Sequence, residues 1–378
     1  MKRIIAHLDM DAFFAAIEER DTPQWRGLPI VVGANPQGGK GRGVVSTANY
    51  KAREYGIKSA LPIRTAWQYS ERARREGEPP AVFVEPDIEK YARVSEEIIK
   101  IVRDVVIQYT EARPLPIGRG RASEAFKIEQ ASIDEMYLDL SFASSFKKAS
   151  EICKKIKEEI KKKERLTASV GIGQNKLIAK IASDQQKPDG LTVVNEKEAA
   201  EFLEPLSIRA IPGIGPKTEE KLVHELGVTL VRNLKNVSLE QMEAMFGKWG
   251  VDIYYKARGI DEAPLEEENV AKSIGEQETF LKDTLDANFI IDRLALMCKN
   301  ITKRLKAEGF NNFRAIVITV RFKGFETITR SHTLPKPADS LEALKFEAIK
   351  LLMPFFDKRE NPGNKLIRLF GVRVEKLK

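Results

Sequence analysis

Hydrophobic and polar positions follow three different patterns along the chain. In residues 3–194, short apolar runs of strand length alternate with segments whose apolar residues recur at helical spacing. Residues 195–259 have helical spacing. Beyond an acidic, Pro-containing stretch at 261–269, the spacing predicts strand, helix, two strands, helix and strand, and this βαββαβ order forms a sheet with two helices on one face. We therefore expect an α+β protein built from several domains.

Two predicted strand ends in the first region carry acidic residues. The apolar run from Arg3 to Leu8 predicts a buried strand that ends at Asp9, and the helical spacing of DAFFAAIEERD follows it. Residues 126–140, FKIEQASIDEMYLDL, alternate as the two strands of a hairpin should, with Asp134 and Glu135 side by side. The other predicted elements are strands at 28–34, 166–173, 313–322, 326–334 and 366–374, a strand turning into a helix at 43–57, and helices at 91–110, 148–166, 289–306 and 341–356.

Length and charge narrow the class of protein. A chain of 378 residues is longer than one hydrophobic core usually supports, so we expect two to four domains. The net charge of +8 is modest and common in proteins with no polyanionic partner. Residues 273–378, however, hold 20 Lys and Arg against 13 Asp and Glu, so nearly all of the excess lies there. This last region is the first candidate for a nucleic-acid contact.

The remaining composition excludes several classes of site. Cys153 and Cys298 each lie in an amphipathic helical pattern, which favours buried small hydrophobes over a disulfide or zinc ligands. The three histidines, His7, His224 and His332, form no cluster in the sequence, so a catalytic metal should be a hard, oxygen-liking ion. No window approaches the roughly 18 apolar residues of a membrane span. We expect a cytoplasmic protein without a membrane partner.

Four carboxylates are candidates for chemistry. Asp9 and Asp11 could simply cap the helix that follows them, and Asp134 with Glu135 could be an exposed hairpin turn. However, the pair at 134–135 interrupts an otherwise apolar strand pattern, and buried carboxylates are costly unless a cation compensates them. Two divalent ions about 3.5 to 4 Å apart would supply that cation and clamp both oxygens of a phosphoryl transfer.

Five motifs in a fixed order carry a family resemblance. They are HLDMDAFFAAIEE, VVSTANYKAREYGIKSALPI, ASIDEMYLDL, SVGIGQNKLIAKIASDQQKPDG and IPGIGPKTEEKL. Together they resemble the Y-family of lesion-bypass DNA polymerases, in its bacterial polymerase IV and archaeal lesion-bypass branch, over essentially the whole chain. The resemblance implies a nucleotidyltransferase that adds deoxynucleotides to a primer 3′ end under the direction of a template, by two-metal phosphoryl transfer, with low fidelity and in translesion synthesis and DNA repair.

The resemblance also implies roles for the carboxylates. Asp9 and Asp134 match the two metal-bridging aspartates, Glu135 matches the neighbouring catalytic glutamate, and Met10 sits where a backbone carbonyl completes one metal site. The implied cofactor is two Mg²⁺ ions, with Mn²⁺ as a substitute. Asp11 matches no ligand position.

Further positions match the family's nucleotide pocket. Phe14 matches the aromatic residue under the incoming sugar, the steric gate against ribonucleotides, although its apolar neighbours also fit an ordinary core aromatic. Tyr50 and Arg53 are three apart on one helical face and can offer a hydroxyl and a guanidinium to the same phosphates. The implied nucleotide-binding positions are Phe13, Phe14, Thr47, Tyr50, Arg53 and Lys187.

DNA contacts are implied in two places. IPGIGPKTEEKL resembles a helix-hairpin-helix, in which a turn at Gly213 and Gly215, followed by Lys217, brings backbone N–H groups to a phosphate. A plain tight turn between packed helices is the alternative. In the basic C-terminal region we take Arg330 and Arg368 as DNA contacts.

The family's right-hand architecture divides the chain. We expect a palm at 1–12 and 81–194, fingers at 13–80, a helical thumb at 195–260 with the helix-hairpin-helix, a linker at 261–272 and a little finger at 273–378. A longer loop at 111–126 departs from the family pattern and has no functional interpretation.

The expected partners are primer-template DNA and deoxynucleoside triphosphates, and we expect a monomer. A sliding clamp is a further candidate, although no segment after the last predicted strand resembles a clamp-binding peptide. Two other functions remain open: a DNA-binding protein without catalysis, against which the intact carboxylates argue, and a two-metal nuclease or phosphohydrolase, against which Phe14 and Arg53 argue. Lesion specificity and fidelity do not follow from the sequence.

Overall fold

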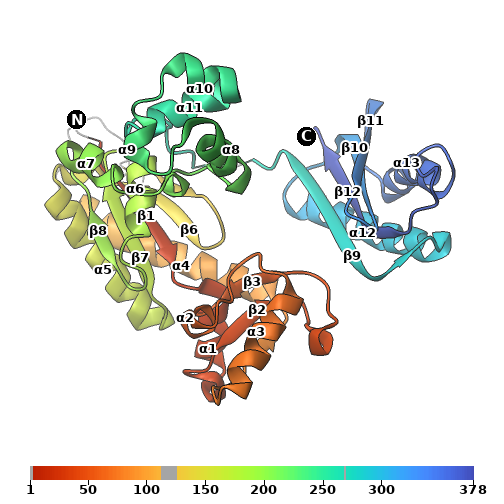
Figure 1. Ribbon diagram of the computed structural model, residues 1–378, viewed down its shortest axis with the longest axis horizontal. Coiled ribbons are helices and arrows are strands. Elements are labelled where there is room, and N and C mark those ends of the chain that lie inside the picture. The colour runs from red at the N-terminus through yellow and green to blue at the C-terminus, as the bar shows by residue number, and fades with distance from the viewer. Residues whose placement is uncertain (1–2, 112–125, 268–269) are drawn as a thin grey trace. The chain divides into compact units, whose positions relative to one another are not determined.

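The computed structural model describes residues 3–111, 126–267 and 270–378 (Figure 1). The loop expected at 111–126 falls almost entirely outside these ranges. No helix in the described part of the chain is long and apolar enough to cross a membrane. The chain forms two compact units, the first comprising Met1–Ala34, Val44–Leu61 and Thr65–Asn269, and the second Asn35–Gly43, Pro62–Arg64 and Val270–Lys378.

A five-stranded sheet is the centre of the first unit. Its strand order is β5-β6-β1-β7-β8, in which β6 and β7 both pair antiparallel with β1, and β8 runs parallel to β7. The predicted hairpin is confirmed, since β5 and β6 are antiparallel neighbours. The strands are β1 (Ile5–Met10), β5 (Ile128–Gln130), β6 (Glu135–Asp139), β7 (Ala168–Gly173) and β8 (Leu191–Val193).

Strand alternation gives this sheet two different faces. Ala6, Leu8 and Met10 of β1 join the large apolar core with helices α4 (Ile88–Glu111) and α5 (Phe146–Glu164). The intervening positions of β1 face α6 (Lys176–Ser183), which packs directly on the sheet. Gly171 of β7 permits this approach, because a Cβ there would lie 2.1 Å from the carbonyl oxygen of Ala179.

A smaller sheet follows, with strand order β3-β2-β4. β2 pairs antiparallel with β3 and parallel with β4, and the packed helix α1 follows β1 after Ala12, which adopts a left-handed conformation. The elements are α1 (Phe13–Asp21), β2 (Ile30–Gly33), β3 (Val45–Ala48), α2 (Tyr50–Glu54), α3 (Ile63–Arg75) and β4 (Val82–Val84), of which the sequence pattern missed α3 and β4.

Residues 195–259 are helical, as predicted, and enclose a separate apolar core. Helix α8 begins at Pro216 directly after Gly215, and the turn before it contains Gly213 with φ of +99°. Only glycine fits this turn without strain, and a Cβ there would also strike the ring of Trp249. The helices are α7 (Ala199–Leu203), α8 (Pro216–Leu226), α9 (Val231–Leu234), α10 (Leu239–Phe246) and α11 (Lys248–Lys256).

The C-terminal part of the second unit confirms the predicted βαββαβ order. Its four strands form an antiparallel sheet in the order β11-β10-β12-β9, and α12 and α13 contact each other and one face of the sheet (Figure 1). The elements are β9 (Ser273–Thr284), α12 (Ala287–Ala307), β10 (Phe313–Phe322), β11 (Thr327–Ala338), α13 (Leu341–Leu352) and β12 (Ile367–Glu375).

The acidic stretch expected to be a linker begins as a fixed part of the first unit. The Asp261 carboxylate accepts a hydrogen bond from the backbone N–H of Leu177 at 3.0 Å. Leu265 is buried and packs with Ile5 and Tyr137 of the large sheet. Asp261 and Leu265 are therefore fastened to the first unit.

Candidate active site

The predicted carboxylates meet on neighbouring strands of the large sheet. Asp9 of β1 lies directly opposite Glu135 of β6, so both side chains project from the same face. Asp134 precedes β6, and its carbonyl oxygen accepts a hydrogen bond from the backbone N–H of Met10 at 3.0 Å. Two local patterns that are 125 positions apart in sequence thus form one cluster.

Asp9 is the most buried member of the cluster that could hold a metal. It is 8% exposed, and its carboxylate is 2.6 Å from the Nζ of Lys187, which also lies 2.8 Å from the carboxylate of Asp184. Burial raises the pKa of Asp9 to about 6 even though Lys187 acts in the opposite direction. Asp9 and Asp184 raise the pKa of Lys187 in spite of its own burial. The ammonium group therefore stays charged and compensates a carboxylate that the site would otherwise disfavour.

Glu135 has a different environment, formed by one residue of α6 and one of β1. Lys180 lies 2.7 Å from its carboxylate, and the Nε2 of His7 lies 3.6 Å from the same oxygen. The contact with His7 and the bond from Lys180 lower the pKa of Glu135 to about 2, although its partial burial acts the other way. The pKa values of two neighbouring carboxylates are thus shifted in opposite directions, which is a common arrangement at catalytic sites.

His7 and Lys180 are members of the site that the sequence interpretation did not assign. His7 is fully buried, and its Nδ1 lies 2.8 Å from the hydroxyl of Ser183. Burial lowers the pKa of His7, and its Nε2 has no hydrogen-bond partner within the described structure. The alternation of His7 with Asp9 along β1 is the sequence signal that places both on one face.

Carboxylates such as those of Asp9, Asp134 and Glu135 suit hard divalent cations, but in this structure their side chains are not arranged as a metal-binding group. The carboxylate of Asp134 accepts a hydrogen bond at 2.6 Å from the hydroxyl of Ser132, which lies two residues earlier in the same turn. Within the residues that the structure describes, no three His, Cys, Asp or Glu side chains form a metal-binding group. The carboxylate oxygens of Asp9 and Glu135 are ligands of the kind that hard divalent cations take, and a cation there would supply the positive charge that Lys187 and Lys180 supply in this structure.

The two phenylalanines after the strand are placed differently. Phe13 is 1% exposed and belongs to the apolar core, so almost none of its surface is free to meet a nucleotide. Phe14 is half-buried and stacks on Tyr91 with ring centroids 4.3 Å apart and planes inclined by 13°. Tyr91 is fully buried, and its hydroxyl donates to Glu18 at 2.7 Å. Phe14 is thus partly exposed and is stacked on a fully buried ring.

The other predicted nucleotide-binding residues lie at the start of α2. Thr47 is half-buried on β3, and Tyr50 is the first residue of α2, which the Asn49 side chain caps. The guanidinium of Arg53 lies 4.6 Å from the centre of the Tyr50 ring, and its Nε donates to the carbonyl oxygen of Ala48 at 2.9 Å. Tyr50 and Arg53 therefore form one unit, as their spacing predicted.

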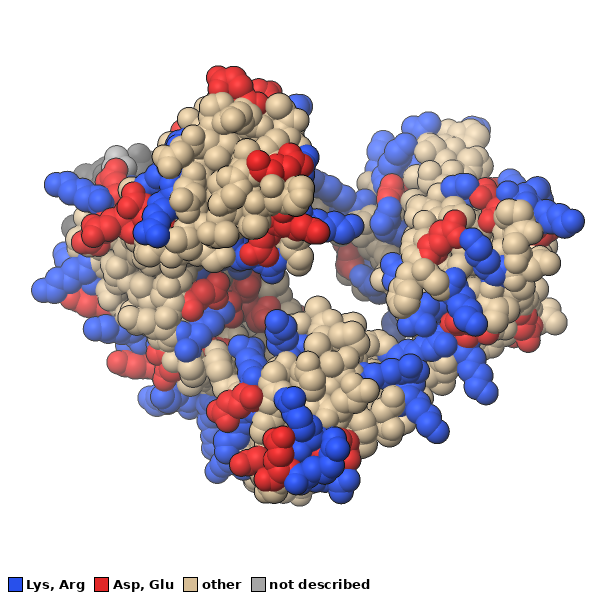
Figure 2. All heavy atoms as spheres, viewed as in Figure 1, with Lys and Arg blue, Asp and Glu red and all other residues tan. Residues whose placement is uncertain are grey.

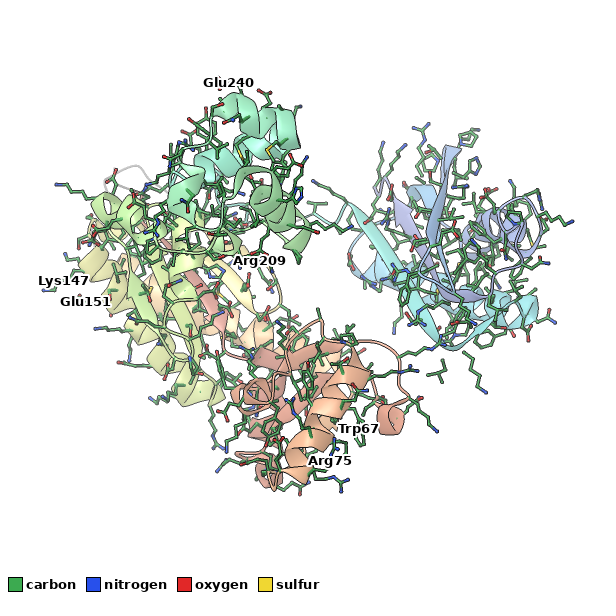
Figure 3. The ribbon with its side chains drawn as sticks, in the orientation of Figure 1. Trp67, Arg75, Lys147, Glu151, Arg209 and Glu240 are labelled. Atoms are coloured by element: carbon green, nitrogen blue, oxygen red, sulfur yellow. The ribbon has the colours of Figure 1, made fainter. Side chains whose placement is uncertain are left out.

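The predicted DNA contacts are exposed or half-exposed but not equally free. Gly213, Gly215 and Lys217 surround the exposed start of α8, and Arg209, labelled in Figure 3, precedes that turn and lies 3.5 Å from Glu219. The guanidinium of Arg330 bonds both oxygens of Glu360 at 2.6 Å. Figure 2 shows Lys and Arg side chains spread over the visible face of the second unit.

Arg368 differs from Arg330 in its surroundings. Its guanidinium lies 4.6 Å from the centre of the Phe325 ring, at the turn between β10 and β11. It interrupts the pairing of β12 with β10, because the register shifts between Ile367 and Leu369.

Protein-family models match both the part of the chain that holds the carboxylates and the C-terminal sheet. The model of the impB/mucB/samB family matches residues 8–114 and 121–184, and that of the impB/mucB/samB family C-terminal domain matches 271–378. A model described as the DNA polymerase-iota thumb domain matches 209–261. The DNA polymerase IV of Methanoculleus marisnigri is 39% identical over 375 residues, covering 99% of this chain and 94% of the relative. DNA polymerase IV 2 of Methanosarcina mazei is 38% identical over 378 residues, covering 100% and 93%.

Solved structures of DNA polymerases are similar to this chain over nearly its full length. A Y-family DNA polymerase chimera, Dbh-Dpo4(243-245)-Dbh, superposes with a TM-score of 0.80 at 28% identity, covering 99% of both chains. The insertion ternary complex of Dbh DNA polymerase has a TM-score of 0.64 at 28% identity, again covering 99% of both. The chain belongs to the Y-family of DNA polymerases.

Proposed function

We propose that this chain is a DNA-directed DNA polymerase that adds deoxynucleotides to a primer 3′ end with low fidelity and bypasses damaged templates in DNA repair and damage tolerance. The polymerase IV relatives and the family fold support the activity. The observation that carries the site assignment is the pair of Asp9 and Glu135 on adjacent strands, each compensated by a lysine where metal ions would otherwise be needed.

The cofactor of the proposed site is two Mg²⁺ ions, with Mn²⁺ as a substitute. Asp9, Asp134, Glu135 and the carbonyl oxygen of Met10 would hold them. Bound ions of this kind lower the pKa of the attacking hydroxyl and stabilise the charge of the leaving phosphate.

The residues around the carboxylates bind and orient the incoming nucleotide. Lys187, once released from Asp9, carries a charge on a tethered loop that can reach a phosphate. Tyr50 and Arg53 offer a hydroxyl and a guanidinium from one helix end, and Thr47 adds a second hydroxyl. Phe14 lies under the sugar and excludes a 2′-hydroxyl, with Tyr91 as its support.

The division into palm, fingers, thumb and little finger and the cellular setting are part of the same proposal. Primer-template DNA and deoxynucleoside triphosphates are the partners, with the thumb turn at Gly213 and the basic C-terminal sheet as the DNA contacts. The enzyme would act in the cytoplasm as a monomer, and a sliding clamp is a candidate partner.

Primer extension with Mg²⁺ tests the function and separates its alternatives. We expect the labelled primer to lengthen, whereas a DNA-binding protein without catalysis would leave it unchanged and a nuclease would shorten it. Asp134→Asn, which keeps the side-chain shape, should reduce extension by about 100- to 1,000-fold while the dissociation constant for DNA changes little. Extension at a near-normal rate by this variant would overturn the assignment of the carboxylates.

A further inference from the structure

Asp11 is the one carboxylate of LDMDAFF that the proposed chemistry leaves without a role. It lies between β1 and α1, two residues after Asp9, and is only 4% exposed. Burying a carboxylate is unfavourable unless its oxygens are fully hydrogen-bonded. Its surroundings therefore reveal what the fold uses it for.

Four donors from three separate parts of the chain bond to this carboxylate. Its Oδ2 accepts from the hydroxyl of Thr167 and from the backbone N–H of Asp189, both at 2.8 Å. Its Oδ1 accepts from the hydroxyl of Ser169 at 2.7 Å and from the Tyr50 hydroxyl at 3.4 Å. A carboxylate offers about four acceptor positions, so these four donors fill them.

Two of the donors form a fixed base. Ser169 belongs to β7, a central strand of the large sheet, and Thr167 immediately precedes it. The backbone N–H of Asp11 also donates to the carbonyl oxygen of Thr167 at 3.0 Å. Asp11 is thus anchored to an inner strand of the large sheet.

The third donor belongs to the loop that carries Lys187. Asp189 lies two residues beyond Lys187, between α6 and β8. The opposite side of this loop is held from α5, because the Nζ of Lys157 donates to the carbonyl oxygens of Asp189 and Gly190 at 2.5 and 2.8 Å. Asp11 holds the same loop by accepting the hydrogen bond from the backbone N–H of Asp189.

The fourth donor is Tyr50 at the start of α2, beside the three-stranded sheet β3-β2-β4. Burial, and after it the charge of Asp11, raises the pKa of Tyr50, so the phenol stays protonated; its single proton is donated to Asp11 in the free chain and would turn to a phosphate oxygen when a nucleotide binds. The Tyr50 ring in turn lies against Arg53. One carboxylate therefore bonds Tyr50 directly and, through the backbone N–H of Asp189, the loop that carries Lys187, although the two come from elements more than 130 positions apart in the sequence.

We propose that Asp11 is a positioning residue that fixes Tyr50 and the Lys187 loop relative to each other and so sets the spacing of the triphosphate grip before a nucleotide arrives. The proposal rests on the proposed function of Tyr50 and Lys187. A grip that is already spaced loses less conformational freedom on binding, which raises affinity for the nucleotide without a direct contact.

A double-mutant cycle on nucleotide affinity tests this inference. The dissociation constant of the correct deoxynucleotide is measured on the full chain with a primer-template whose 3′ end is dideoxy-terminated, so no catalysis is needed. Tyr50→Phe should raise this constant about fivefold, and Asp11→Ala should raise it about tenfold, as expected for a lost hydrogen bond to a charged group. Because Asp11 acts through Tyr50, adding Tyr50→Phe to Asp11→Ala should cost less than a further twofold.

Two further variants separate positioning from stability. Asp11→Asn keeps an oxygen for Thr167 and Asp189 and turns its amide toward hydroxyls that can rotate to accept, so it should lose less thermal stability than Asp11→Ala and still weaken nucleotide binding. Asp139→Ala is the matched control, because this carboxylate accepts the backbone N–H of Ser141 at the other end of β6. It should lower thermal stability and leave nucleotide affinity unchanged.

The outcomes distinguish this inference from the proposed function. Nucleotide affinity within twofold of the unmodified chain in both Asp11 variants, or a Tyr50→Phe effect of equal size with and without Asp11, would overturn the positioning role. Absence of primer extension by the unmodified chain would instead overturn the proposed function, since extension is not needed for the binding cycle.

Discussion

The large sheet of the first unit and the C-terminal sheet of the second are built alike on one side and differ on the other. Each buries an apolar face under two long helices, α4 and α5 in the first case and α12 and α13 in the second. On its other face the first sheet carries α6 and a network of paired charges around Asp9 and Glu135. The other face of the second sheet has no helix packed on it among the described residues.

The face without a helix is polar but not enclosed. Thr329 and Ser331 of β11 and Arg373 of β12 are exposed there. A shallow cavity of about 310 Å³ lies across the strands, lined by Gly275, Glu276, Gln277, Thr319, Gly371, Val372 and Arg373. The lining offers hydroxyl, amide and guanidinium groups from Thr319, Gln277 and Arg373, beside the carboxylate of Glu276.

The difference shows what each task requires of a sheet. Chemistry needs carboxylates in a partly dry place, where their charges are strong but must be compensated by lysines or metal ions. A grip on DNA needs donors that stay wet and adaptable, because phosphate contacts fix position without demanding enclosure. Substitutions on the enclosed face should therefore alter nucleotide use, and substitutions in the second unit should alter DNA affinity.

The largest effect is expected at Phe14, beside the enclosed face. Phe14→Ala should raise ribonucleotide incorporation about a hundredfold relative to deoxynucleotides, a difference of about 2.7 kcal/mol in transition-state free energy. Steady-state kinetics with both nucleotide types and the melting temperature of the variant measure this. The stack on Tyr91 means that some stability is lost as well, but less than the roughly 3 to 5 kcal/mol of a fully buried phenylalanine.

Phe346 of the second unit provides the matched control for this test. It is 63% exposed on α13, with the Nζ of Lys350 at 5.2 Å from its ring centre. Phe346→Ala should leave sugar selectivity unchanged. A Phe14→Ala variant that is less stable but equally selective would show that Phe14 is a core aromatic and no gate.

A smaller effect should separate the two arginines of the second unit. Arg368→Ala should weaken primer-template binding several-fold and reduce the slope of log affinity against log salt by about 0.9, the value for one phosphate contact. Arg330→Ala should change this slope much less, because its guanidinium is already neutralised by both oxygens of Glu360. Fluorescence titrations at several salt concentrations measure both slopes, and equal losses would mean that the Glu360 pair opens on DNA.

Local patterns predicted the elements that hold the site, because strand alternation and helical spacing are short-range properties. The pairing of Asp9 with Glu135 follows once β1 and the β5–β6 hairpin lie in one sheet. Contacts between distant segments could not be read in the same way: Asp11 bonds to Thr167 and Asp189, which are 156 and 178 positions away. The family resemblance supplied roles for ligands and said nothing of Asp11.

Very short elements and misleading local composition explain several other differences between the predicted and the observed structure. β4 and β8 have three residues each, too few to show an alternation. The acidic stretch after residue 260 looked like a linker because its composition is polar, but Leu265 is an apolar anchor within it. Arg330 is predicted to contact DNA, and its ion pair with Glu360, 30 positions away, is formed only by the fold.

The last prediction concerns the charge states of the enclosed face in the metal-free protein. The pKa of Asp9 is raised from 3.8 to about 6, chiefly by burial. Such a group stabilises the fold fully below pH 3.8, where it is protonated in both states, and this stabilisation is lost as pH rises through 6. Asp9→Asn should therefore stabilise the protein at pH 7, by at most about 3 kcal/mol at 1.36 kcal/mol per pKa unit, and by almost nothing near pH 4.

Glu135 should respond with the opposite sign, which makes the pair its own control. Its pKa is lowered from 4.5 to about 2, chiefly by the contact with His7, so its contribution to stability is present above pH 4.5 and is lost as pH falls toward 2. Glu135→Gln should thus lower the melting temperature at pH 7, where Asp9→Asn raises it. Thermal unfolding of both variants in a metal chelator, from pH 4 to pH 7, measures the difference. If both variants changed the melting temperature in the same direction at pH 7, the pKa values of Asp9 and Glu135 would not be shifted in opposite directions.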